Sequence, residues 1–311
     1  MRDNKNSLGA EDVADILGIS KNTVYKLVKR GDINSYRVGK KFRFTMDDIE
    51  GYIRSSRNMP PSGSRRSSDF AAADRSSDIV ISGQDVMLDI LSSYIERHEK
   101  GGMCLRSYAG SYDSLVNLYH GKVHVASSHL WDGDSGEYNI SYVRRLVPGI
   151  SSVIVHLTCR TQGLYVAEGN PKGIKTWADV SGPDVRMINR EKGAGSRVLL
   201  DEHLRLLGIS KKQVRGYDEE SHSHLTVAAA VARGDADVGV GDMKAVSQVS
   251  GVDFIPLQKE RYELVIREEM MHHPKVEAIT EILRSKEFRE EFIGLSGYDT
   301  RDMGRIVATI E

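Results

Sequence analysis

The chain has 311 residues, of which 40% are hydrophobic and 28% are charged, a length and composition typical of a soluble globular protein with two or three domains. No run of about 18 apolar residues is present, which argues against a membrane-spanning helix, and the polar N-terminal segment lacks the apolar core of a secretory signal. We therefore expect a cytoplasmic protein. The two cysteines, Cys104 and Cys159, form no CxxC pair and predict neither a disulfide framework nor a zinc site.

The charge is distributed unevenly along the chain. Residues 1–60 carry 12 Lys and Arg against 8 Asp and Glu, whereas the remaining residues carry 31 against 36. A mildly basic head on an acidic body is consistent with a nucleic-acid-binding head and a separate body.

The first two predicted helices have the spacing of a helix-turn-helix. Apolar residues recur with helical spacing over Leu8–Leu17, and Gly18 is placed to end that helix. Ser20 is expected to cap a second helix over Lys21–Arg30. The expected buried stripe of the second helix is Val24, Leu27 and Val28. Its polar N-terminal residues could reach base edges in a major groove.

A β-hairpin is predicted next. Apolar and basic residues alternate over Tyr36–Phe44 around a turn at Gly39 and Lys40. Its basic residues would form a wing that contacts phosphates and positions the protein on DNA without reading sequence. Thr45 is expected to cap a last helix over Met46–Arg54.

These residues resemble the excisionase and MerR-like winged helix-turn-helix family. The matching segments are Glu11–Leu27, Gly31, Arg37–Lys40, Phe44 and Asp47–Ile49. The resemblance implies a DNA-binding domain over residues 1–57 with double-stranded DNA as the partner. The candidate DNA-binding residues are Ser20, Lys21, Asn22, Thr23, Tyr25, Lys26, Lys29, Arg37, Lys40, Lys41 and Arg43. The alternative is a small helical module that makes protein contacts.

A linker follows this head. Residues 55–77 are rich in Ser, Pro, Gly and Arg and show no periodicity, which is typical of a flexible tether. We place the linker at residues 58–77 and the body at residues 78–311.

Strands and helices alternate in the body, which predicts a mainly parallel sheet with right-handed crossovers. The first predicted strands are 78–82, 103–108 and 123–127, and the first predicted helices are 86–95 and 112–120. Ligands bind such sheets at the carboxyl ends of strands, near helix N-termini. A small hydroxyl side chain follows each strand there: Ser82, Ser111 and Ser128.

The middle of the body contains a candidate anion site. A predicted strand over Val185–Ile188 leads into Asn189 and Arg190, a glycine-rich turn at Gly193 and Gly195, and a helix opened by Ser196 and Arg197. Backbone amides, a hydroxyl, a cation and a helix dipole at one point favour an anion, although a capped helix with a surface arginine is the alternative. The other predicted strands are 153–157, 164–167, 238–242, 254–257 and 262–266, and the other predicted helices are 228–234, 275–283 and 288–295.

The body resembles periplasmic-binding-protein-like domains of the two-lobed type II kind. More narrowly, it resembles a cytoplasmic subgroup related to molybdate-binding proteins and fused to helix-turn-helix heads. The matching segments are 128–132, 137–139, 160–163, 189–190, 193–201, 216–217, 223–224, 234–239 and 297–299. Trp131 and Ser196 stand where leucine and threonine would be expected. The resemblance implies an α/β domain with one lobe at residues 78–157 and 256–311 and another at residues 158–255.

The same resemblance implies a molybdate- or tungstate-like oxyanion as the effector, with no other cofactor. The candidate ligand-binding residues are Ser82, Ser111, Ser128, His129, Arg160, Asn189, Arg190, Gly195, Ser196, Arg197 and His224. Three arginines are many for a small dianion held by neutral donors, so some are expected to pair with Glu219, Glu220 or Asp242. A carboxylated organic ligand or a pterin-type anion would also suit arginine with histidine, and His224 could instead only cap and pack.

We expect a ligand sensor and no enzyme. The sequence has no Gly-x-Ser-x-Gly elbow, no HExxH motif and no complete Walker loop. Lobe closure would hinge at two crossover segments near residues 155–167 and 254–268. A homodimer is expected because one small head buries too little DNA surface for high specificity. The alternative function is a cytoplasmic carrier or sensor of an organic anion or cofactor precursor, whose head makes protein contacts.

Overall fold

The computed structural model describes residues 8–17, 21–30, 33, 35–38, 41–46, 48–49, 79–295 and 297–311. The chain divides into two compact units, residues 1–71 and residues 72–311. None of the helices within the described ranges has the length and apolar character needed to cross a bilayer.

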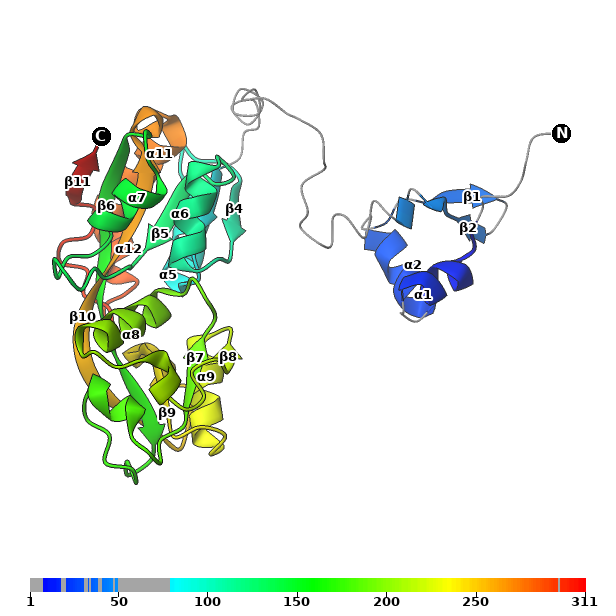
Figure 1. Cartoon of the computed structure of the whole chain (residues 1–311). Coiled ribbons are helices and arrows are strands. Elements are labelled where there is room, and N and C mark those ends of the chain that lie inside the picture. Colours follow the sequence, from blue (N-terminus) through cyan, green and yellow to red (C-terminus); the bar gives the residue numbers. More distant parts are fainter. Residues whose placement is uncertain are drawn as a thin grey trace. The chain divides into compact units, whose positions relative to one another are not determined.

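The N-terminal unit has the predicted helix-turn-helix and hairpin elements (Figure 1). They are α1 (Ala10–Leu17), α2 (Lys21–Arg30), β1 (Tyr36–Val38) and β2 (Lys41–Arg43), and the two strands pair antiparallel. Val13 of α1 and Val24 and Leu27 of α2 are buried against Phe44, and Val28 packs beside them. The buried stripe predicted for the second helix is therefore confirmed.

Thr45 begins the next helix by a reciprocal cap. Its hydroxyl accepts a hydrogen bond from the Asp48 amide (3.2 Å), and its own amide donates to the Asp48 carboxylate (2.8 Å). The predicted cap is thus confirmed, and of the predicted helix 46–54 the described residues 46, 48 and 49 are helical. The predicted turns and cap at Gly18, Ser20, Gly39 and Lys40 lie outside the described residues.

The body combines one large sheet with helices on its faces. The strands are β3 (Ile79–Ser82), β4 (Cys104–Ser107), β5 (Val125–Ser128), β6 (Ser152–Ala167), β7 (Met187–Arg190), β8 (Glu220–Ser221), β9 (Val238–Asp242), β10 (Val252–Arg267) and β11 (Ile306–Ile310). The helices are α5 (Val86–Arg97), α6 (Ser111–Tyr119), α7 (Ile140–Leu146), α8 (Gly195–Leu206), α9 (His224–Ala232), α10 (Met243–Val246), α11 (Pro274–Arg284) and α12 (Lys286–Glu290). Short 3₁₀ turns are η1 (Trp177–Ser181), η2 (Lys211–Gln213) and η3 (Glu268–Met270).

The strand order is β4-β3-β5-β10-β6-β9-β7-β8, with β11 paired to β6. Strands β3, β4 and β5 run parallel, as do β7, β8 and β9, but β10 is antiparallel to both β5 and β6, and β6 is antiparallel to β9 and β11. The sheet is therefore mixed, and the expectation of a mainly parallel sheet is wrong for its centre.

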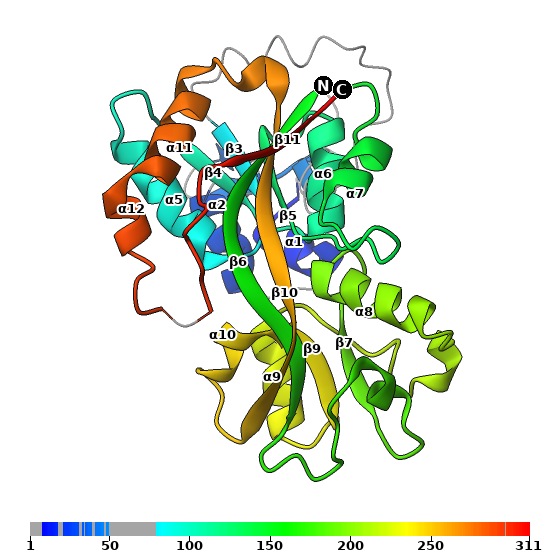
Figure 2. The ribbon, with the colours of Figure 1, turned by 90° about the vertical axis from the view of Figure 1, so that its left-hand side faces the viewer.

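Strands β6 and β10 divide the body into two lobes, because both run side by side from one half to the other (Figure 2). The first lobe contains β3, β4, β5 and β11 with α5, α6, α7, α11 and α12. The second lobe contains β7, β8 and β9 with α8, α9 and α10. The sequence predicts two separate strands in each of these segments, which is wrong. The polar residues in the middle of each, such as Arg160 and Glu260, interrupt the apolar pattern while the backbone stays extended and paired.

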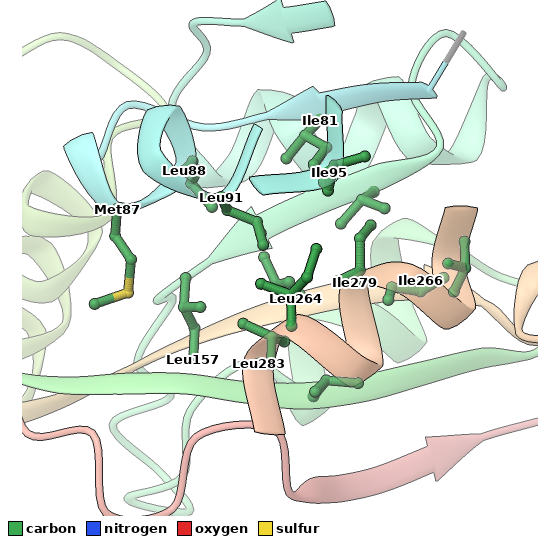
Figure 3. Close-up of a cluster of buried hydrophobic side chains, with 14 of the residues drawn as sticks. Ile81, Met87, Leu88, Leu91, Ile95, Leu157, Leu264, Ile266, Ile279 and Leu283 are labelled. Atoms are coloured by element: carbon green, nitrogen blue, oxygen red, sulfur yellow. The ribbon is translucent and has the colours of Figure 1, made fainter. Parts of the chain in front are cut away.

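Alternating side chains of the long strands form the core of the first lobe. Leu264 and Ile266 of β10 pack with α5 and α11 in one cluster, whereas Val265 belongs to a second cluster with α6 and α7 (Figure 3). Helix α5 contributes residues at spacings of three and four: Met87, Leu88, Leu91 and Ile95. The sheet of this lobe is therefore covered on both faces.

The second lobe has its own core. Leu199, Leu200 and Leu204 of α8 pack against Leu164 of β6 and Val240 of β9. This packing fixes the N-terminal end of α8, which bears the predicted glycine-serine segment, beside the central strands.

Several boundaries differ from the predictions. Helix α9 begins at His224, four residues earlier than predicted, because the Ser223 hydroxyl accepts a hydrogen bond from the Thr226 amide. Helix α12 covers 286–290 instead of 288–295, because Ser285 caps it. Helices α7 and α10 and strands β8 and β11 were not predicted from the sequence.

The central role of β10 in the core predicts a large effect of truncating Leu264, which is completely buried. Leu264→Ala should lower the free energy of unfolding by about 2–5 kcal/mol, because it leaves a cavity in a packed core. Urea denaturation measures this change. Leu105→Ala, at a side chain that is 45% exposed, is the control and should change stability by less than about 0.5 kcal/mol.

Candidate ligand site and nucleic-acid interface

A cavity of about 160 Å³ lies between the two lobes of the body. Its walls come from the N-terminal ends of α6, α8 and α9, the middle of β6 and β10, and the residues that follow β3 and β9. The lining residues are Gln84, Asp85, Ala109, Gly110, Ser111, Ser127, His129, Arg160, Arg190, Ala194, Gly195, Ser196, His224, Leu225, Asp242, Lys244, Ala245, Gln248 and Tyr262. The volume is below the roughly 300 Å³ at which pockets for drug-sized ligands begin, so the cavity suits a small ligand.

Hydrogen bonds join the two lobes around this cavity. The Tyr112 amide at the start of α6 donates to the Gly193 carbonyl before α8 (3.0 Å), and Arg190 donates to the Gln84 side chain (2.8 Å). Lys244 of the second lobe donates to Asp85 of the first (3.1 Å). The structure therefore has its lobes in contact.

Two long helices point uncapped N-termini at the cavity. The residues before α6 and α8 are Gly110 and Ala194, and neither supplies a side-chain hydrogen bond to the helix. By contrast, α5 and α9 are capped by Asp85 and Ser223. Apart from Tyr112, whose amide bonds to Gly193, the first amides of α6 and α8 have no side-chain cap, and both helix dipoles favour negative charge there.

Serine hydroxyls add to these amides. Ser111 and Ser196 stand in the first turns of α6 and α8, and both line the cavity. Ser196 Oγ is buried and has no hydrogen-bond partner among the described residues. A buried unpaired hydroxyl in a cavity wall is a group that a bound ligand would satisfy.

Arg160 forms the floor of the cavity. Its guanidinium donates to Asp85 (2.6 Å) and to Glu260 (2.6 Å), and it stacks over the Tyr262 ring at 4.2 Å from the ring centre. Burial tends to raise the pKa of both carboxyls, but Arg160 outweighs it: the pKa of Asp85 falls below its ordinary range and that of Glu260 falls to about 2. Both carboxylates are therefore ionised at neutral pH.

Histidines lie on two sides of the cavity. His129 Nδ1 is 2.7 Å from Glu260, and its backbone amide donates to the Ser111 hydroxyl. Burial lowers the pKa of His224 to about 4, although Asp242, 3.9 Å away, acts in the opposite direction. His224 is therefore neutral at pH 7 and offers the cavity a polar nitrogen without a charge.

Seven of the predicted ligand residues come together in the cavity lining: Ser111, His129, Arg160, Arg190, Gly195, Ser196 and His224. Their cations are not free, because Arg160 pairs with Asp85 and Glu260, and Arg190 pairs with Glu191. The lining Lys244 likewise contacts Asp85.

Four predicted ligand residues do not line the cavity. Ser82 bonds to Ser114 beneath the sheet edge, and Ser128 is a buried last residue of β5. Asn189 bonds to the Tyr217 carbonyl, and Arg197 pairs with Glu220 over the Tyr217 ring. These four side chains are buried elsewhere in the lobes and do not line the cavity.

The sequence analysis did not single out Asp85, Lys244 or Tyr262 as site residues. Asp85 lies three residues after the end of β3 and Lys244 two residues after the end of β9, so a search of the residues that follow each strand could have found both. Tyr262 gave no such signal, because it lies inside a predicted strand.

The predicted DNA-binding residues are only partly described. Tyr25 is exposed, Lys21 forms a 3.2 Å surface ion pair with Glu11, and Arg43 is partly exposed on β2. Such a surface ion pair contributes little to stability, so Lys21 can exchange Glu11 for a DNA phosphate at little cost in free energy. Ser20 and Lys40 lie outside the described residues, as do the side chains of Asn22, Thr23, Lys26, Lys29, Arg37 and Lys41.

Two family models match the chain. A PBP superfamily domain matches residues 92–284, and a helix-turn-helix domain matches residues 7–57. The first match contains most of the cavity lining, and the second contains the winged helical head.

Relatives and solved structures agree with these matches. The chain is 39% identical over 300 residues to the uncharacterized protein YvgK of Bacillus subtilis, covering 96% of each chain. It is 50% identical over 113 residues to an uncharacterized protein of Clostridium pasteurianum, covering 36% of this chain and 100% of that one. A phosphate-bound substrate-binding protein of a putative phosphate transporter from Clostridium perfringens shares the fold, with a TM-score of 0.54, 14% identity and coverage of 71% of this chain and 99% of that one.

The buried Arg160 pairs predict an acid-dependent stability. The pKa of Glu260 is about 2 in the folded chain, below its ordinary 4.5, so its contribution is present above pH 4.5 and is lost as pH falls toward 2. Glu260→Gln should lower the free energy of unfolding by about 3–5 kcal/mol at pH 7, because the buried Arg160 then lacks one of its two carboxylate partners. Urea denaturation measures this difference between the variant and the wild type, which should be smaller at pH 3 than at pH 7.

Glu99→Gln, at an exposed side chain, is the control and should match the wild type at both pH values. Equal stability of Glu260→Gln and the wild type at pH 7 would contradict the role given to this ion pair.

Proposed function

This chain belongs to the PBP superfamily domain family and carries a helix-turn-helix domain, and from this premise we propose that it is a ligand-responsive transcriptional regulator that senses a small oxyanion. A helix-turn-helix with a PBP-like domain is the arrangement of a DNA-binding regulator that responds to a small ligand. The observation that carries the oxyanion is the pair of uncapped helix N-termini, α6 and α8, at one small cavity.

The proposed organisation follows the sequence. Residues 1–57 bind DNA, residues 58–77 connect, and residues 78–311 bind the ligand between lobes of about 78–157 with 256–311 and about 158–255. We place the protein in the cytoplasm, where its DNA is, as a homodimer whose two heads together contact enough DNA for specificity. No catalytic role is proposed.

The charge arrangement favours a tetrahedral dianion such as molybdate or tungstate. The cations Arg160, Arg190 and Lys244 already contact carboxylates. A ligand would therefore be bound mainly by the N-terminal ends of helices, by backbone amides and by the hydroxyls of Ser111 and Ser196. Neutral donors of this kind can surround an anion at several points without a full opposite charge.

Ligand binding would act on the arrangement of the lobes. The amides of α6 belong to the first lobe and those of α8 to the second, so an anion between them favours the state in which the lobes touch. DNA affinity can then change only by the difference in ligand affinity between the lobe arrangements.

Isothermal titration of the full chain with molybdate, tungstate and sulfate tests the ligand. We expect micromolar or tighter binding of the first two and none of sulfate. Ser196→Ala should weaken binding about 10-fold or more, because a hydrogen bond to a charged group contributes about 1.5–3 kcal/mol. The matched control is Ser128→Ala, which removes another buried, unpartnered hydroxyl outside the cavity lining and should leave the affinity unchanged.

Binding to an operator selected from random duplexes tests the head. The logarithm of the affinity should fall linearly with the logarithm of the salt concentration, because Lys and Arg release counterions from phosphates. Arg43→Ala should reduce that slope by about one. Lys100→Ala, in the body, is the control, and a slope near zero for the wild type would favour a head that contacts protein instead.

A further inference from the structure

A second polar cluster lies on β6, next to the cavity residue Arg160 but outside the cavity lining. It contains Cys159 and His156, which are three residues apart on the strand. Residues three apart in a regular strand point to opposite faces. Here Tyr262 pairs with Thr158 and Glu263 with His156, so Leu157 is an extra residue in a β-bulge. The bulge brings the thiol and the imidazole together.

The cluster has the order thiol, imidazole, carboxylate. Cys159 Sγ lies 3.8 Å from His156 Nε2, and His156 Nδ1 lies 3.8 Å from Glu263 Oε1. Glu263 is fully buried, and its Oε1 has no hydrogen-bond partner among the described residues, while its Oε2 accepts from Asn139 (2.7 Å). Asn139 thus holds the carboxylate in place, and its Oε1 lies 3.8 Å from the imidazole and 3.4 Å from Arg261 Nε.

The surroundings favour a positively charged imidazole. Burial lowers the pKa of His156, but the neighbouring Cys159 sulfur and Glu263 carboxylate outweigh it and raise the pKa to about 9. An imidazolium beside a thiol stabilises the thiolate, which is the reactive form of cysteine. A base oriented by a third group is the arrangement that activates nucleophiles in proteins.

The two cysteines of the body differ in exposure. Cys159 is partly exposed, whereas Cys104 is buried. The backbone of Cys159 pairs with Asp299, whose carboxylate also holds Arg301 at the surface. Burial raises the pKa of Cys104, which keeps that thiol unreactive.

We propose that Cys159 is a covalent modification site, a thiolate activated by His156 and Glu263 that reacts with small electrophiles of the hydroperoxide class. This site is independent of the proposed oxyanion sensing and of the cavity. Glu263 acts through His156 and is a positioning residue.

The reaction with hydrogen peroxide balances without a further reagent. The thiolate sulfur attacks one peroxide oxygen, an S–O bond forms and the O–O bond breaks. The leaving hydroxide takes the proton of the His156 imidazolium and becomes water. Sulfur is oxidised by two electrons to a sulfenic acid, the peroxide is reduced, and His156 is left neutral.

The test measures each cysteine separately in the full chain. Iodoacetamide labelling is followed by peptide mass spectrometry, and hydrogen peroxide oxidation is followed by trapping of the sulfenic acid with dimedone. At pH 7 we expect Cys159 to be alkylated about 10-fold faster than glutathione, because more of it is thiolate although each thiolate is less nucleophilic. Cys104 should stay unlabelled in the folded chain, and Cys159→Ser should abolish dimedone trapping.

Variants separate activation from structure. His156→Gln should slow alkylation at pH 7 by about 10-fold and make the rate rise with pH as for an ordinary thiol. Glu263→Gln should give an intermediate loss and the same change of pH profile. His272→Gln, at an exposed histidine, is the control and should leave the rate unchanged.

The wild-type pH profile decides the question even if a variant does not fold. A rate that is nearly constant from pH 6.5 to 8 supports the proposal, because the thiolate is then already formed. A rate that rises about tenfold per pH unit, as for an unperturbed thiol, overturns it. A rate for Cys159 no higher than that of glutathione overturns it as well.

Discussion

The guanidinium of Arg160 is the group on which the body of this protein depends. It is buried in the middle of β6, and a buried charge is tolerated only with close partners. Asp85 reaches it from the first lobe and Glu260 from the neighbouring strand β10. The place where both long strands pass between the lobes is therefore fixed by an ion-pair network as well as by backbone pairing.

That network decides which helix ends remain open. Asp85 caps α5 and pairs with Arg160 at once, so the N-terminus of α5 is already satisfied. The helices that follow Gly110 and Ala194, by contrast, have no side-chain cap at the ends that border the cavity. Because the cations nearby are neutralised, recognition in this cavity depends on the placement of neutral donors more than on net charge.

The sequence predicted the two-part architecture because its signals are local: helical spacing, hairpin alternation and strand-end serines. It located Ser111, Gly195 and Ser196 at the cavity for that reason. It failed where long-range partners decide the outcome. Arg160 pairs with Asp85 and Glu260, and Ser82 bonds to Ser114. The expected pairing of an arginine with Glu220 is confirmed for Arg197, but no local signal pointed to Asp85 and Glu260 as the partners of Arg160.

The bulge at Leu157 gives β6 two polar faces that share one backbone. Arg160 serves the cavity, and Cys159 with His156 forms a cluster outside it. Both groups of residues therefore lie on one strand that passes between the lobes. Any coupling between the two must then be reciprocal: a ligand that alters the reactivity of Cys159 implies that modification of Cys159 alters ligand affinity by the same free energy.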